Sequence, residues 1–333
     1  MTADRCGEAR PAERTVDGGE KLRPTGCAVD CGEKARPAET SACSENGVTY
    51  TRNRSLEGES ACAYSCGALP VIDTHCHLSD ERYPDKGAVV DEYLASGVGI
   101  AVNAGYDMAS SKAGAVLSKT YPSVFFTVGV HPDNAENATE ENMKILADLS
   151  RDEKCLAVGE IGLDFHYTPY DEEAQKRAFS RQILLAKEVG LPFAVHMRDA
   201  TKETVDLLSA HKNDFSAAVM HCYSGSVETA KILLDLGMYF SFSGTLTFKN
   251  ARGLKEVARF LPEDRILTET DSPYLAPEPY RGKENRPAYV CRVLEALAEI
   301  RGENIRKTAE RVFKNARAVF PKLDRFLSGQ GRI

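Results

Sequence analysis

The chain has 333 residues and 42% of them are apolar, which is enough for one large domain or two of ordinary size. Its formal net charge of −7 excludes proteins that hold nucleic acid by overall positive charge, so a phosphate-rich substrate would need local cations or metal ions. No apolar run approaches the roughly 18 residues of a membrane span, and the first residues lack the apolar stretch of a signal peptide, so we expect a cytoplasmic protein without a membrane partner.

Residues 1–68 differ in composition from the rest of the chain. They contain imperfect repeats such as "CGEARPAER" and "CGEKARPAET", and only five residues of the Val, Ile, Leu and Phe set. A segment so poor in apolar side chains cannot offset its ordering entropy, so we predict a disordered extension. A true start of translation near Leu69 is the open alternative, because no second Met precedes Met108.

Most of the cysteines fall in this extension: Cys6, Cys27, Cys31, Cys43, Cys62 and Cys66. Without an export signal we expect these thiols to be reduced. The repeated C-x3-C spacing also differs from the C-x2-C spacing of common zinc sites, so zinc binding is the less favoured interpretation of this segment.

Residues 69–322 alternate short apolar runs with helical patterns, and residues 323–333 form a C-terminal tail. Continuous apolar runs are typical of parallel strands buried on both faces. Between them, spacings such as Phe179, Ile183 and Ala186 before Gly190 predict helices. The eight candidate strands are residues 71–77, 98–105, 124–132, 156–164, 192–196, 217–225, 238–244 and 265–273.

Eight strand–helix alternations over about 250 residues are what an α/β fold of the (β/α)8 TIM barrel type requires. A doubly wound open sheet is the alternative, since it alternates in the same way. His, Glu and Asp residues fall at the carboxyl ends of the first, fourth, fifth, sixth and eighth runs. These ends converge on one mouth in a barrel but lie many strand widths apart in an open sheet, so we predict the barrel.

The stretch "VIDTHCHL" places two histidines at the end of the first run. Because side chains alternate along a strand, His75 and His77 point to the same side while Cys76 faces away. A lone buried histidine is usually a hydrogen-bonded core residue, but two imidazoles on one side can share a metal ion.

Four more polar residues end later runs: Glu160 in "VGEIGLD", His196 in "PFAVHMRDA", His221 in "AVMHCYSG" and Asp271 in "ILTETDSPY". Glu160 lies in an apolar frame without a neighbouring Lys or Arg, where an unpaired carboxylate would be costly. Six ligands exceed the needs of one tetrahedral ion, so we expect two divalent cations that share the two oxygens of Glu160. Asp271 is also a candidate base for a water molecule, and the set predicts a metal-dependent hydrolase of phosphate esters, esters or amides.

With these residues in view, five segments together resemble the TatD family of metal-dependent deoxyribonucleases over residues 70–320. The segments are "IDTHCHL", "GEIGLDFHY", "HMRDA", "HCYSGSVETAKILLDLGMYFSFSGTLTFKNA" and "LTETDSPYLAPEPYRGKENRPAYV". The resemblance implies an amidohydrolase-type TIM barrel that cleaves DNA, often as a 3′ to 5′ exonuclease preferring single strands. The ligands that it implies are His75, His77 and Asp271 for one ion, His196 and His221 for a second, and Glu160 for both. Whether the ions are Mg, Mn or Zn stays open.

Candidate substrate contacts follow the third, fifth, seventh and eighth runs: His131, Arg198, Lys249, Arg281 and Lys283. At the mouth such cations would meet phosphates, although ordinary surface charge is the simpler interpretation of each alone. The resemblance also leads us to expect a carboxylate near Arg286, so the local hydrogen bonding there is in question.

Two other functions remain open. A deacylase of mis-acylated tRNA on the same scaffold would use the same ligands, and a closed pocket with a site for a free amine would favour it. Several phosphate-binding Arg and Lys residues would favour the nuclease. A non-enzymatic scaffold is disfavoured because no expected ligand is missing. The oligomeric state is not predicted.

Overall fold

The computed structural model of this protein describes residues 71–330. The predictions made for residues 1–68, including those for their six cysteines, therefore lie outside the described residues.

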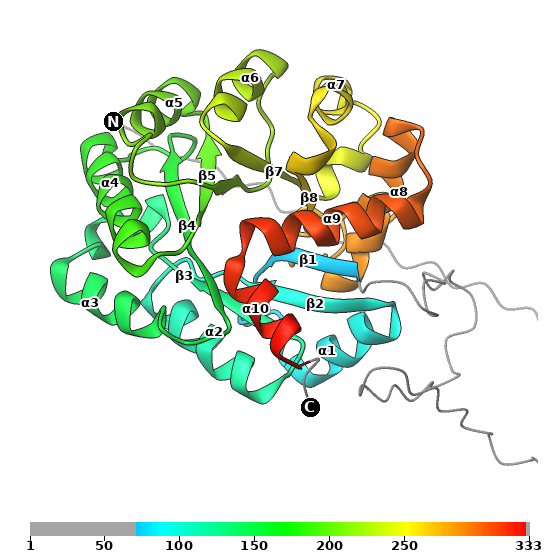
Figure 1. Cartoon of the computed structure of the whole chain (residues 1–333), viewed down its shortest axis with the longest axis horizontal. Helices are drawn as coiled ribbons and strands as arrows, with labels where there is room; N and C mark the ends of the chain where they lie inside the picture. Colours follow the sequence, from blue (N-terminus) through cyan, green and yellow to red (C-terminus); the bar gives the residue numbers. More distant parts are fainter. Residues whose placement is uncertain (1–70, 331–333) are drawn as a thin grey trace, which may run out of the picture.

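Eight parallel strands form one sheet in the order β1 to β8, each beside the next in the sequence, and helices surround them (Figure 1). This arrangement confirms the predicted TIM barrel. The strands are β1 Val71–Cys76, β2 Val98–Asn103, β3 Val124–Val128, β4 Cys155–Asp164, β5 Phe193–Arg198, β6 Ala218–Met220, β7 Met238–Phe242 and β8 Ile266–Thr268.

Helices follow the strands and cover the outside of the barrel. The helices are α1 Lys86–Ala95, α2 Met108–Thr120, α3 Glu140–Leu149, α4 Glu172–Val189, α5 Thr201–Ala210, α6 Val227–Asp235, α7 Arg252–Phe260, α8 Val290–Arg301, α9 Ile305–Val319 and α10 Pro321–Gln330. Short 3-10 turns lie at Pro132–Asn137, Gly244–Thr247, Glu263–Arg265 and Pro287–Tyr289. Helix α4 ends at Gly190 in the left-handed conformation, as its sequence pattern predicts.

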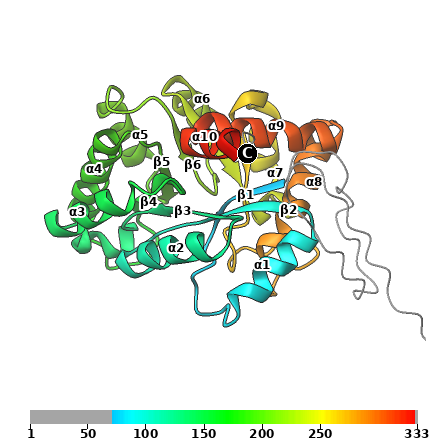
Figure 2. The same ribbon diagram turned by 60° about the horizontal axis from the view of Figure 1, so that its bottom comes forward.

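Helix α10 lies beside α9 across the end of the barrel where the strands begin (Figure 2). Its Leu323 is buried, and its Phe326 packs edge-on against Phe125 of β3 at 5.2 Å between ring centroids. The segment that we separated from the barrel as a tail thus begins inside a packed helix. The opposite end of the barrel, where the strands end, is called the mouth below.

The barrel closes between β1 and β8 mainly through the residues that follow β8. Thr74 donates a hydrogen bond to the carbonyl oxygen of Thr268 at 3.1 Å. The buried carboxylate of Asp73 accepts from both the backbone N–H and the hydroxyl of Thr270, at 2.9 and 2.5 Å. Farther along, the N–H of Asp271 donates to the carbonyl oxygen of His75 at 2.9 Å. Closure therefore fixes the chain on which Asp271 is carried next to the first strand.

Candidate metal centre

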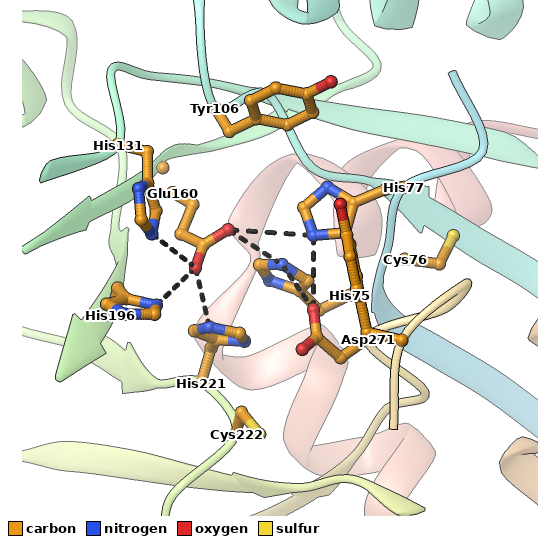
Figure 3. A network of polar contacts seen from close by, with 12 residues as sticks. His75, Cys76, His77, Tyr106, His131, Glu160, His196, His221, Cys222 and Asp271 are labelled. Carbon is orange, nitrogen blue, oxygen red and sulfur yellow. Dashed lines mark hydrogen bonds and ion pairs between the residues drawn. The ribbon is translucent and has the colours of Figure 1, made fainter. Parts of the chain in front are cut away.

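The six predicted ligands come from five strand ends and meet at the mouth (Figure 3). His75 lies in β1 and His77 directly follows it, while Cys76 between them faces away and donates to the carbonyl oxygen of Val102. Glu160 lies in β4 and His196 in β5. His221 directly follows β6, and Asp271 lies three residues beyond β8.

Irregular pairing in two strands coincides with the candidate ligands. The register between β1 and β2 shifts between Asp73 and Cys76, and the register between β4 and β5 shifts between Val158 and Ile161. His75 falls within the first shift and Glu160 within the second. Such irregularities re-aim side chains, and here both side chains reach the same point in the mouth.

Glu160 stands at the middle of the group, and its two oxygens face different histidines (Figure 3). Its Oε1 lies 2.7 Å from Nδ1 of His196 and 2.8 Å from Nε2 of His221. Its Oε2 lies 3.4 Å from Nε2 of His75 and 3.8 Å from Nε2 of His77. One carboxylate thus separates two sets of nitrogen atoms.

Asp271 completes the set on the Oε2 side. Its Oδ1 lies 3.2 Å from Nε2 of His77 and 3.8 Å from Nε2 of His75. The rings of His75 and His221 stack at 4.0 Å between centroids, which brings the two sets into contact.

Two carboxylates that the sequence analysis did not select support the histidines from outside. Asp164 Oδ2 lies 3.0 Å from Nε2 of His196. Glu269 is fully buried, and its Oε1 lies 3.2 Å from Nδ1 of His221. The same oxygen accepts a hydrogen bond from the N–H of Cys222 at 2.7 Å. Asp164 had a signal in the sequence, since period-two alternation places it on the same face of β4 as Glu160. Glu269 follows β8, where no strand periodicity predicts its direction.

Burial and ion pairing act in opposite directions on the charges of the centre. Burial opposes the charge of Glu160, but His221 and the hydrogen bonds from His196 and His221 outweigh it and hold the pKa of Glu160 well below its usual value. Burial likewise opposes the charge of Asp271, and the hydrogen bond from His77 outweighs it and lowers the pKa of Asp271. Both carboxylates are therefore ionised, which is the form that binds cations.

The pKa values of the histidines diverge for the same reasons. Burial, followed by the nearby His221, lowers the pKa of His75, and burial lowers that of His131 to about 3. For His196, burial is outweighed by hydrogen bonds to Asp164 and Glu160, which raise its pKa to about 9. At neutral pH the imidazoles of His75 and His131 are therefore neutral, and each has a free lone pair for a metal ion.

The residues present fit divalent cations. His75, His77 and Glu160 bring ligand atoms within 4.8 Å of one another, and so do Glu160, His196 and His221. Two further sets with this spacing are His131, Asp164 and His196, and His75, His221 and Glu269. Nε2 of His75 is buried and lacks a hydrogen bond among the described residues, although it points between two carboxylates. A nitrogen in that environment is suited to a cation.

The candidate substrate contacts differ in their relation to this centre. His131 is close to it, with Nε2 at 3.8 Å from Oε1 of Glu160. The guanidinium of Arg198 lies over the ring of Tyr167 at 4.8 Å, and that of Arg281 over Phe248 at 4.3 Å. Within residues 71–330, no hydrogen bond or ion pair joins the four predicted cations to the six predicted ligands; these cations are Arg198, Lys249, Arg281 and Lys283.

The hydrogen bonding of Arg286, which the sequence left in question, involves two carboxylates. Its guanidinium pairs with Glu92 at 3.2 Å and with Glu284 at 3.0 Å. Two carboxylates from other positions thus satisfy the side chain.

Residues 72–321 match the family model described as "TatD related DNase". The chain belongs to the TatD family. A relative from Bacillus subtilis, named "Uncharacterized metal-dependent hydrolase YabD", is 39% identical over 251 residues, which are 75% of this chain and 98% of that relative. The relative from Salmonella typhimurium named "3'-5' ssDNA/RNA exonuclease TatD" is 32% identical over 257 residues, which are 75% of this chain and 98% of its own.

A solved structure of a TatD homologue is also similar to this chain. The crystal structure of YJJV, a TatD homologue from Escherichia coli, matches with a TM-score of 0.71 and 29% identity, over 75% of this chain and 98% of that one. This TatD-family protein is a metal-dependent hydrolase. Among residues 71–330 no helix is long and apolar enough to cross a membrane.

Proposed function

We propose that this hydrolase is a nuclease that cleaves phosphodiester bonds of DNA, removing nucleotides from the 3′ end of single strands. The observation that carries the proposal is the position of Glu160, whose two oxygens face two separate sets of imidazoles. A shared carboxylate between two ligand sets is suited to a pair of divalent cations, the arrangement that supports in-line displacement at phosphorus. The printed name of the Salmonella relative, a 3'-5' exonuclease of single-stranded DNA and RNA, supports the same class.

The ligands divide between two cation positions. His75, His77 and Asp271 would hold one ion, His196 and His221 the other, and Glu160 both. When bound, such ions withdraw electron density from phosphoryl oxygens and make a coordinated water more acidic. Imidazole and carboxylate ligands accept several divalent metals, Mg, Mn and Zn among them, and elemental analysis of the purified protein identifies the ions.

Asp271 is the proposed base. It is ionised, and its side chain is 14% exposed while that of Glu160 is 5% exposed, so a water molecule has better access to Asp271. Its Oδ1 is also within 3.2 Å of Nε2 of His77, which holds the carboxylate in place. Asp271 would orient the attacking water and accept its proton, while the oxygens of Glu160 already face five histidines, His131 included.

Arg198 and Arg281 are proposed to contact substrate phosphates. Among the described residues neither has an ion-pair partner within 4 Å, so each cation is available to an anion. Stacking on Tyr167 and Phe248 holds the guanidinium groups in place. Two free cations near the mouth reconcile an acidic chain with an anionic substrate.

The test uses purified protein, 5′-labelled single-stranded DNA, matched RNA, and added Mg, Mn or Zn. We expect a ladder that shortens from the 3′ end, is abolished by EDTA and is absent in Glu160→Ala. Lys144→Ala is the matched control, because among the described residues this exposed side chain pairs only with Glu140 on the outer helix α3.

Protein that contains metal but cleaves no nucleic acid under any of these conditions would contradict the nuclease proposal. Release of the amino acid from a mis-acylated tRNA by the same protein would then assign the centre to deacylation.

A further inference from the structure

An exposed tyrosine with an arginine laid over it borders the metal centre. Tyr274, in the loop after β8, has 47% of its surface exposed, and its ring lies 5.7 Å from the ring of His77 in a T-shaped arrangement. The guanidinium carbon of Arg82, in the loop after β1, lies 4.1 Å from the centroid of the Tyr274 ring. A flat, accessible pair thus stands next to a predicted metal ligand.

Asp80 fixes the guanidinium in this position. Its Oδ1 accepts from Nε of Arg82 at 2.9 Å, and its Oδ2 accepts from Nη2 at 2.8 Å. Asp80 is itself held ionised, because the hydrogen bond from Arg82 lowers its pKa to about 2. The fork–fork contact neutralises the charge of Arg82 and occupies two of its edge donors. One face of the guanidinium lies over the Tyr274 ring, and the side chain is 41% exposed, so its other face is accessible to a further planar ring.

This chemistry differs from that of the other arginines at the mouth. Arg198 and Arg281 also lie over aromatic rings, but no carboxylate of the described residues pairs with them. A guanidinium without a carboxylate partner attracts phosphate more strongly than one whose charge is balanced by a paired carboxylate. The paired Arg82 and the exposed Tyr274 are instead suited to stacking with another planar ring.

We infer that Arg82 and Tyr274 form a stacking platform for an unpaired nucleobase at the end of a nucleic-acid strand, next to the bond that is cleaved. The inference rests on the proposed nuclease function and adds the group that would select unpaired strands. A base within a duplex has both faces covered by its neighbours, whereas a terminal unpaired base can offer a face to the platform. Stacking does not distinguish DNA from RNA, and the platform serves either.

Binding of a hydrolysis-resistant strand tests the platform. The metal-loaded protein is mixed with a single strand that has phosphorothioate linkages and carries 2-aminopurine as its 3′-terminal base. The Kd of the strand and the quenching of 2-aminopurine fluorescence are measured. We expect quenching by the wild type and by Tyr274→Phe, which keeps the ring. In Tyr274→Leu we expect the quenching to be lost and binding to weaken about tenfold. Bound metal should be unchanged in both variants.

Two controls separate stacking from general damage. Phe260→Leu removes an aromatic ring of similar exposure, 40%, at the end of the outer helix α7, and should leave binding and quenching unchanged. A strand with an abasic terminal position should bind the wild type about tenfold more weakly than the complete strand, but bind Tyr274→Leu equally well with or without the base.

The outcomes also separate this inference from the proposed function. If the wild type binds and cleaves single strands while Tyr274→Leu keeps the quenching and the preference for the terminal base, the platform is wrong and the nuclease stands. If the wild type neither binds nor cleaves any strand, both are wrong.

Discussion

Glu160 joins the two halves of the centre, because its two oxygens face different sets of imidazoles. Replacement by alanine should therefore reduce the occupancy of both cation positions together. His77→Ala should affect mainly the position that it shares with His75 and Asp271. We expect the bound metal per chain, measured by elemental analysis after dialysis, to fall further in Glu160→Ala than in His77→Ala. If Glu160→Ala retained nearly as much bound metal per chain as the wild type, the shared-ligand arrangement would be wrong.

Glu269 acts on the centre through His221. Its Oε1 lies 3.2 Å from Nδ1 of His221, so it orients the ring and leaves Nε2 directed at Glu160. Replacing a carboxylate that supports a metal-binding histidine typically weakens metal affinity by about 10- to 100-fold. For Glu269→Gln, which keeps the size of the side chain, we expect metal affinity to fall by about tenfold. Competition with a chromophoric chelator measures it, and circular dichroism checks the fold.

Thr120→Ala is a suitable control for this measurement. Within residues 71–330 the exposed Thr120 hydroxyl of α2 donates only to the backbone oxygen of Val116. Its metal affinity should equal that of the wild type, and a similar loss in both variants would point to a general effect on folding.

The sequence predicted the six residues that come together because strand ends and period-two alternation define directions in space. His75 and His77 illustrate this, since alternation alone places both imidazoles on one side and Cys76 on the other. The supporting residues were missed for a physical reason. Glu269 reaches His221 only because the chain after β8 is bound to β1 through Asp73 and Thr270, a contact between residues 197 positions apart.

At the scale of elements, Gly162 allows β4 and β5 to approach at the centre. It has a φ of +143°, and a Cβ at this position would lie 2.0 Å from the carbonyl oxygen of His196. Gly162→Ala should therefore strain the strand pair and displace His196. We expect a loss of about 2 kcal/mol or more in the free energy of unfolding, measured with urea, together with weaker metal binding.

Gly253→Ala provides the contrast within the same barrel. Gly253 lies in α7, and a Cβ there would meet no atom within 4 Å. Because alanine is the better helix former, this change should stabilise the protein by about 0.5–1 kcal/mol. A Gly162→Ala protein as stable as the wild type would show that the strands can separate without cost.

The eight strands were predicted because buried parallel strands are continuous apolar runs, and their order followed from the barrel. Their ends were less predictable: the last run was expected to extend over 265–273, whereas β8 is Ile266–Thr268. Thr270 and Asp271 depart from the strand because the side chain of Asp73 and the backbone of His75 bind them instead. Apolar content predicts the strand, but tertiary hydrogen bonds decide where it stops.

For the whole molecule, the distribution of charge matters more than its sum. The formal net charge is −7, so long-range attraction to nucleic acid is not expected, and binding should depend on a few contacts at the mouth. Each phosphate neutralised on a single strand contributes about −0.7 to the slope of log K against log salt concentration. With Arg198 and Arg281 as the phosphate contacts, we expect a shallow slope of about −1.4.

Kd for the phosphorothioate strand, measured over a series of salt concentrations with metal held constant, gives this slope. Arg198→Ala should reduce its magnitude by about 0.7, because one phosphate contact is lost. Arg151→Ala removes a cation whose side chain is 80% exposed, which pairs with Asp148 and lies just before β4, at the end of the barrel away from the mouth. It should leave the slope unchanged. Equal slopes for all three proteins would mean that the strand meets its cations elsewhere on the surface. A much steeper slope would mean that many more cations contribute than Arg198 and Arg281.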